Sequence, residues 1–214
     1  MNVHIAAEGW LADTRASYDT VAADYADVVR GFLAGAPYDR AILALFAELA
    51  GDGPVLDAGC GPGHVTAYLN GLGADAFGLD LSPGMIEVAR RDHPVLRFAV
   101  GSMTALGLAG ASVAGVIAWY SLIHVPDDEI AVVLAEFRRV LRPGGVVLLG
   151  FHDGDGSRLK TEGYGGHPMK VHVHRRRPER VAAWLDEAGF TVEAQLLQPA
   201  HAALFARSRP ASTS

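Results

Sequence analysis

Short apolar runs alternate with segments of helical period through the middle of the chain. The runs are too short for helices and too continuous for half-exposed strands, which is typical of a parallel sheet covered on both faces. They predict five strands, at residues 54–57, 76–80, 95–100, 113–119 and 146–151. Helices are expected after Gly63, at 82–91 with Ser82 as the N-cap, and at 126–141.

Both ends of the chain add elements to this core. Residues 12–31 and 38–50 are predicted to be helices. Residues 152–168 are rich in Gly, Asp and His and are predicted to be a loop, and a short strand (170–175) and a helix (178–188) follow it. Residues 190–197 and 202–207 are expected to form an antiparallel hairpin at the edge of the sheet.

These elements predict one α/β domain over residues 1–214, which is long enough for a single full core. Its sheet would be seven-stranded, doubly wound and mostly parallel, with an antiparallel C-terminal hairpin and an N-terminal helical cap. The cap would be 1–50, the central core 51–151, the C-terminal part 152–207, and the tail 208–214 would be disordered.

Composition narrows the setting of the protein. The formal net charge of −6 argues against a general nucleic-acid binder. The dense basic run 175–177 is interpreted as a solvated surface segment, with a rim that attracts an acidic substrate as the alternative. We find neither an apolar segment of the about 20 residues that span a membrane nor a signal peptide. With Cys60 as its single cysteine the chain cannot form an internal disulfide, which suits a reducing cytoplasm. We expect a monomer or homodimer.

A glycine-rich turn follows the first predicted strand. Asp57 precedes Gly59, Gly61 and Gly63, and a predicted helix begins directly after them. Because glycines have no Cβ atom, the backbone can turn sharply here and a ligand can lie against it. A dinucleotide-binding turn has the spacing G-x-G-x-x-G, but this chain has His64 after its third glycine. An acid ahead of the turn also suits a cation better than a pyrophosphate.

Further motifs follow the glycine turn in a particular order. Asp80 ends the second predicted strand, 23 positions after Asp57, about where an acid meets the hydroxyls of a ribose. The segments that come next are LSPGM at 81–85, GSM at 101–103, WYSLIH at 119–124 and LRPGG at 141–145. In this order and at these spacings, residues 15–207 resemble the class I S-adenosylmethionine (SAM) methyltransferases.

The resemblance implies SAM as the cofactor and S-adenosylhomocysteine (SAH) as its product. In the family pattern Asp80 holds the ribose, Leu81 and Met85 pack on the adenine, and Tyr18 and Tyr25 belong to a segment that covers the cofactor. The family often has Asp where this chain has Ser102. The full set of implied cofactor residues is Tyr18, Tyr25, Asp57, Gly59, Gly61, Asp80, Leu81, Met85, Gly101, Ser102, Met103 and Trp119.

The acceptor is expected to be a small molecule. The turn 119–124 lacks the prolines of adenine-N6 and glutamine methyltransferases. Cytosine-C5 methyltransferases need a nucleophilic cysteine in the acceptor half, whereas Cys60 lies on the cofactor turn. A hydroxyl or ammonium acceptor must lose a proton, so His124 is the first candidate base and His152 the second. A carboxylate acceptor would need no base. The segment 164–166 could hinge a lid over the acceptor.

No metal site is expected. A magnesium site of the catechol-methyltransferase type would need Asp and Asn ligands after the fourth and fifth strands, but only Asp153 and Asp155 are present. His172 and His174 share a strand face, yet a zinc shell needs three or four ligands and no suitable cysteine or acid accompanies them.

We therefore expect methyl transfer from SAM to a hydroxyl, carboxyl or amine of a small metabolite, in bacterial secondary metabolism. The alternatives are a protein of this fold that binds SAM without transferring methyl, such as a cyclase or regulator, and a nicotinamide-dependent oxidoreductase. His64 and Asp57 count against the oxidoreductase.

Overall fold

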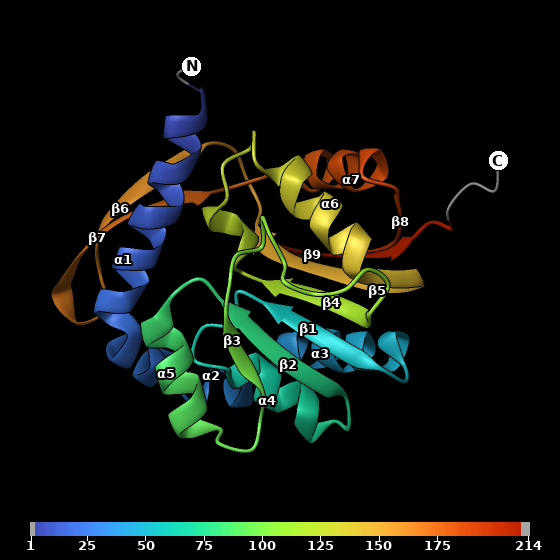
Figure 1. Cartoon of the computed structure of the whole chain (residues 1–214), viewed down its shortest axis with the longest axis horizontal. Coiled ribbons are helices and arrows are strands. Elements are labelled where there is room, and N and C mark those ends of the chain that lie inside the picture. Colours follow the sequence, from blue (N-terminus) through green and yellow to red (C-terminus); the bar gives the residue numbers. More distant parts are fainter. Residues whose placement is uncertain (1–2, 211–214) are drawn as a thin grey trace.

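The computed structural model describes residues 3–210 of the chain and places one seven-stranded sheet at their centre (Figure 1). The strand order is β3-β2-β1-β4-β5-β9-β8. Strands β1 to β5 run parallel, and β9 lies antiparallel between β5 and β8. The strands are β1 (Pro54–Ala58), β2 (Asp75–Asp80), β3 (Phe98–Val100), β4 (Val113–Trp119), β5 (Leu141–His152), β8 (Phe190–Gln198) and β9 (His201–Ser208). The predicted fold, including the antiparallel C-terminal hairpin, is confirmed.

Helices cover both faces of the sheet (Figure 1). Side chains of α6 and α7 pack on one face, and side chains of α3 and α4 pack on the other. The α-helices are α1 (Val3–Val29), α2 (Phe32–Gly35), α3 (Pro37–Ala50), α4 (His64–Gly71), α5 (Pro83–Asp92), α6 (Ile130–Val140) and α7 (Pro178–Glu187). Among residues 3–210, no helix is both long enough and apolar enough to cross a membrane.

The central strands are apolar because neither face meets water. Every residue of β4 is buried, as expected of a parallel strand with helices on both sides.

Helix α5 begins as predicted. The Ser82 hydroxyl accepts a hydrogen bond from the Met85 amide at 3.0 Å, and Pro83 lies in the first turn.

The fifth strand begins earlier than predicted. Leu141 already pairs with Val113, and the next pair is Val146 with Gly115, so β5 has extra residues at this point. These residues include Pro143 and Gly144, and Gly144 has a φ of 74°. The turn predicted there is thus a bulge in a longer strand.

Helix α1 is longer than predicted. It begins at Val3 rather than residue 12 and ends at Val29, because Gly31, with φ 77°, leaves the helical conformation. The helix crosses the edge of the sheet where the parallel strands end (Figure 1). Its second half is anchored by apolar contacts, with Ala22 and Ala26 packed against Met85 and Val88 of α5.

The predicted loop 152–168 is wrong. Residues Ser157–Gly163 form β6 and His167–His174 form β7, joined by the 3₁₀ turn η2 (Tyr164–Gly166), and the two strands make a separate antiparallel sheet. The hairpin is ordered by α1, because Met169 and Val171 of β7 are buried together with Val21. Figure 1 shows this hairpin running beside α1, away from the large sheet.

The sheet continues into the segment predicted to be a tail. Ser208 is the last residue of β9 and is buried, and its hydroxyl donates to the Arg142 carbonyl at 2.9 Å. The Arg209 amide still donates to the Gly189 carbonyl. The remainder of the predicted tail, 211–214, lies outside the described residues.

Candidate active site

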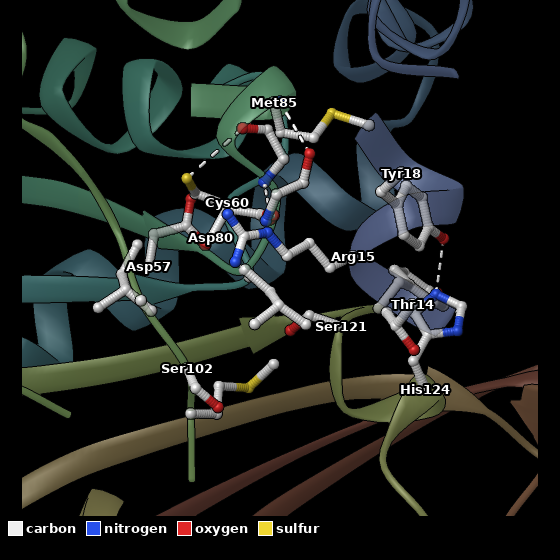
Figure 2. Close-up of a pocket in the computed structure, with 18 of the residues that line it drawn as sticks. Thr14, Arg15, Tyr18, Asp57, Cys60, Asp80, Met85, Ser102, Ser121 and His124 are labelled. Carbon is white, nitrogen blue, oxygen red and sulfur yellow. Dashed lines mark hydrogen bonds between the residues drawn. The ribbon is translucent and has the colours of Figure 1, made fainter. Parts of the chain in front are cut away.

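A cavity opens beneath α1 at the ends of the parallel strands (Figure 2). The empty space in the cavity and in its open mouth together is about 860 Å³. The loops after β1, β2, β3 and β4 form its floor. Every residue predicted to bind the cofactor lines it: Tyr18, Tyr25, Asp57, Gly59, Gly61, Asp80, Leu81, Met85, Gly101, Ser102, Met103 and Trp119. The first candidate base, His124, lines it as well. Residues scattered over more than a hundred positions therefore face one space.

The glycine turn after β1 is held tightly. Gly59, Gly61 and Gly63 all have positive φ angles. A Cβ atom on Gly59 would lie 2.3 Å from Cβ of Ser121, so the turn can approach the loop after β4 only because this residue is glycine. The amides of Gly59 and Cys60 both donate to the Leu79 carbonyl, which ties the turn to β2.

Asp80 braces the floor from the end of β2. One carboxylate oxygen accepts a hydrogen bond from the Gly61 amide and the other from the Ser82 amide, each at 2.8 Å. Each oxygen keeps a further lone pair for a ligand. Burial raises the pKa of Asp80 to about 6.

Asp57 is the more deeply buried of the two acids. Its Oδ2 accepts a hydrogen bond from the Thr66 hydroxyl at 2.6 Å, and burial raises its pKa to about 7 against the opposing effect of that bond. Two buried carboxyls thus face one cavity, and a cation bound between them would favour their ionised forms.

The residues predicted to lie around the adenine come from the segments that follow β2 and β3. Met85 is buried, and Leu81, Met85 and Met103 all line the cavity. The Ser102 hydroxyl shares a hydrogen bond of 2.7 Å with the Thr104 hydroxyl and accepts the Thr104 amide at 3.2 Å. Ser102 therefore caps its own turn while it lines the cavity.

Aromatic side chains of α1 roof the cavity and are packed against η2. Tyr18 and Tyr25 of α1 pack edge to face with their ring centroids 6.0 Å apart. Tyr164 of η2 lies against Tyr25 at 4.7 Å, and the imidazole of His167 bonds Asp24 of α1 at 2.8 Å. The predicted hinge segment 164–166 thus contacts the roof helix, and its Gly165 and Gly166 have positive φ angles.

The turn after β4 carries strain. Tyr120 has a φ of 53°, a conformation rare for a bulky residue. Its amide donates to the Gly150 carbonyl at 2.9 Å, and Gly150 leaves room for the Trp119 ring, since a Cβ there would lie 2.5 Å from it. The turn is completed by Ser121, whose hydroxyl donates to the Ala58 carbonyl at 2.6 Å.

His124 ends this turn in η1 (Leu122–His124). Its Nε2 lies 2.6 Å from the Tyr18 hydroxyl (Figure 2). Its Nδ1 lies 2.9 Å from the His172 carbonyl oxygen. Burial lowers the pKa of His124 to about 4, so the ring is neutral at physiological pH.

His152, the second candidate base, does not line this cavity. It ends β5 beside Tyr120 and His201, with ring centroids 5.2 Å from each. Tyr120 stands between, since it lines the cavity and directs its hydroxyl to His201 Nδ1 at 3.1 Å. Within the described residues, no three His, Cys, Asp or Glu side chains are grouped as metal ligands.

The chain is similar to known methyltransferases in both sequence and fold. Residues 55–145 match the family model of a methyltransferase domain. These residues form a methyltransferase domain, and the described chain has the class I methyltransferase fold. The match runs from β1 to the bulge in β5, and it includes the glycine turn, Asp80 and the turn that carries His124. The family predicted from the sequence is confirmed.

Curated relatives match less than half of this chain. A malonyl-[acyl-carrier protein] O-methyltransferase of Pectobacterium atrosepticum is 39% identical over 93 residues, which are 44% of this chain and 36% of the relative. A demethylmenaquinone methyltransferase of Renibacterium salmoninarum is 36% identical over 95 residues, covering 44% and 39% of the two chains. The chain thus spans just over a third of the length of these relatives.

Solved structures match the domain over most of its length. DhpI in complex with SAH has a TM-score of 0.74 at 24% identity, over 95% of this chain and 99% of that chain. A 1,6-didemethyltoxoflavin-N1-methyltransferase of Burkholderia thailandensis, bound to its substrate and SAH, has a TM-score of 0.62 at 25% identity, over 86% and 87%. These ligands support the cofactor predicted for this methyltransferase domain.

Several lining residues of the methyltransferase domain were missed in the sequence. The first half of α1 contributes Trp10, Leu11, Thr14 and Arg15. Trp10, Thr14 and Tyr18 follow one another at the helical spacing of four, which is a signal that could have been read. The contributions of Ser121 and Tyr120 depend on the turn geometry after β4.

Arg176, the middle residue of the basic run 175–177, holds the turn that carries His124. Arg176 is only 3% exposed. It donates to the Leu122 carbonyl at 2.9 Å, to the Val125 carbonyl, and to Asp127 at 3.0 Å. Arg176 is therefore neither a solvated surface residue nor part of a rim that attracts an acidic substrate. It fixes the backbone on both sides of His124.

Replacing Arg176 by methionine is expected to destabilise the domain by about 1–3 kcal/mol, because carbonyls that are buried with the guanidinium lose their donor. The matched control is Arg177→Met, whose side chain is exposed and pairs with exposed Asp155, and it should change stability by no more than about 0.5 kcal/mol. Urea unfolding followed by circular dichroism measures both. Equal losses in the two variants would show that Arg176 is not the clamp.

Proposed function

We propose that this protein binds SAM and transfers its methyl group to a small metabolite. The observation that carries the proposal is one continuous cavity, with the braced glycine turn and Asp80 on one side and the Tyr18–His124 pair on the other. This geometry brings a nucleoside site and a proton-accepting group within reach of one ligand.

The residues present fit SAM. Gly59 and Gly61 leave backbone exposed to a ligand, and the lone pairs of Asp80 not used by the Gly61 and Ser82 amides can accept ribose hydroxyls. Asp57 and Asp80 together suit a cationic ligand. When bound, SAM supplies a methyl group that is already activated by its positively charged sulfur.

The contribution of the chain is then alignment and exclusion of water. The glycine turn and Asp80 fix one reactant, while Trp119 and the roof of α1 confine the other beside it. Holding two reactants in line replaces a collision with a step inside one complex. The aromatic roof of Tyr18 and Tyr25, against which Tyr164 packs, keeps solvent from the space between the two reactants.

The known relatives do not share an acceptor. One is named for O-methylation of a malonyl-acyl carrier protein, and one neighbour is named for N1-methylation of 1,6-didemethyltoxoflavin. Both names belong to those proteins. For this chain we infer a small acceptor, because α1 roofs the cavity and the β6–β7 hairpin packs against α1.

Titration calorimetry with SAM, SAH and NADH tests the cofactor. We expect SAM and SAH to bind and NADH not to bind. Release of SAH in the presence of phenols, alcohols, carboxylates and amines then tests the transfer. Binding of NADH without SAM would assign the protein to an oxidoreductase class, and binding of SAM without SAH release from any acceptor class would favour a SAM-binding protein that does not transfer methyl.

A further inference from the structure

We propose that Tyr18 contacts the acceptor directly, that it relays the acceptor's proton to His124, and that the acceptor atom is a hydroxyl oxygen. The inference rests on the proposed function and deepens it, since it names both the class of acceptor and a catalytic residue. Tyr18 then has a role beyond covering the cofactor.

The first step is that His124 has no free nitrogen. A carbonyl oxygen can only accept, so the contact of 2.9 Å with the His172 carbonyl places the ring proton on Nδ1. Nε2 of the neutral ring is then an acceptor, and its lone pair receives the Tyr18 hydroxyl at 2.6 Å. An acceptor molecule cannot bond His124 without displacing Tyr18.

The second step is that Tyr18 can accept while it donates. A phenolic oxygen that gives its proton to His124 keeps lone pairs for one further donor. Tyr18 and His124 both line the cavity, and Figure 2 shows the tyrosine reaching from α1 to the imidazole. A proton donor in the cavity therefore finds the Tyr18 oxygen as its route to His124.

The third step selects among acceptors by charge. The acids among the described lining residues are Asp57 and Asp80, both at the cofactor side, and Arg15 is the one arginine. Neither acid is hydrogen-bonded to Tyr18 or His124, and a bound sulfonium would repel an ammonium ion. A carboxylate carries no proton at neutral pH and would leave the relay unused. A neutral hydroxyl compound, such as a phenol or an alcohol, fits both conditions.

The reaction couples two proton transfers to methyl transfer. The acceptor O–H proton moves to the Tyr18 oxygen while the Tyr18 proton moves to His124 Nε2. The acceptor oxygen forms its bond to the methyl carbon as the carbon–sulfur bond breaks and its electron pair stays on sulfur, giving SAH. The resulting imidazolium keeps its Nδ1–H on the His172 carbonyl and later loses the extra proton to water.

Kinetics of Tyr18→Phe test the relay. The variant keeps the ring that packs on Tyr25 and removes only the hydroxyl. We expect kcat for hydroxyl acceptors to fall by about 10²- to 10⁴-fold, the usual contribution of general base catalysis, without a change in the Kd for SAH. The double variant Tyr18→Phe/His124→Asn should lose no more than the single ones, because the two groups act as a unit. Tyr68→Phe, on α4 outside this cavity, is the control and should keep full activity.

The ligand-free protein gives a second measurement that needs no acceptor. Long-range ¹H–¹⁵N spectra should show His124 protonated at Nδ1, with an Nε2 signal that shifts in Tyr18→Phe. The His124 signals are assigned by their loss in His124→Asn. A proton on Nε2, or an Nε2 signal that Tyr18→Phe does not move, would overturn the relay.

The outcomes separate this inference from the function beneath it. SAH release with carboxylates or amines alone, or full kcat in Tyr18→Phe with a hydroxyl acceptor, overturns the relay and leaves methyl transfer in place. A weaker SAH affinity at unchanged kcat would return Tyr18 to a covering role. If SAM binds and no acceptor class releases SAH, the transfer itself is refuted and the relay with it.

Discussion

Replacing Gly59 by alanine is expected to abolish SAM binding and to destabilise the domain. The residue has a φ of 75°, and a new Cβ would lie 2.3 Å from Cβ of Ser121. Ser121 has little freedom to retreat because its hydroxyl is bonded to the Ala58 carbonyl. The left-handed conformation alone costs about 1–2 kcal/mol with a side chain, and the overlap adds about 1–3 kcal/mol. Calorimetry with SAM and urea unfolding measure the two effects.

A second glycine separates strain from overlap. Gly73 has a φ of 93°, but a Cβ there would meet no atom within 4 Å. Gly73→Ala should therefore show the cost of strain alone and bind SAM normally, since it lies outside the cavity. If Gly59→Ala bound SAM as the unmodified protein does, the turn after β1 would not be the cofactor cradle.

Asp80→Ala is expected to weaken SAM binding by about 1–3 kcal/mol, the range for hydrogen bonds to a charged group, which is about 5- to 150-fold in Kd. The substitution removes the proposed ribose contacts, and it also releases the Gly61 and Ser82 amides that shape the floor. Calorimetry with SAM and with SAH measures the loss, which should be similar for both because the ribose is common to them.

Asp75 offers the matched control for Asp80. It begins the same strand, is exposed, and pairs with Arg97. Asp75→Ala should leave SAM affinity unchanged and alter stability by at most about 0.5 kcal/mol. Unchanged affinity in Asp80→Ala as well would remove Asp80 from the cofactor site.

The grouping of the predicted cofactor residues in one cavity was predictable because its determinants are local. A glycine turn between a strand and a helix, and an acid at the end of the next strand, are each specified within a few neighbouring residues. The order of parallel strands then brings Asp57 and Asp80 to one edge of the sheet. Backbone pairing confirms this, since Asp57 lies opposite Gly78 on β2, two residues before Asp80.

The acceptor side was predicted less well because its contacts are long-range. Tyr18 and His124 are 106 positions apart, and nothing near either residue in the sequence names the other. The charge of Arg176 suggested solvent, but three acceptors on the turn 122–127 compensate its burial. The β6–β7 hairpin was missed because its order depends on packing against Val21 of α1 rather than on its own polar sequence.

The family model covers only one side of the cavity. The floor lies within residues 55–145, the part that matches the model, whereas the roof comes from α1, which lies outside that match and packs against the β6–β7 hairpin. The roof also joins the floor through small polar links, such as Asp19 with the Ser82 hydroxyl at 2.6 Å. Substitutions in the roof are therefore expected to change acceptor choice while the floor that carries Asp57 and Asp80 keeps its geometry.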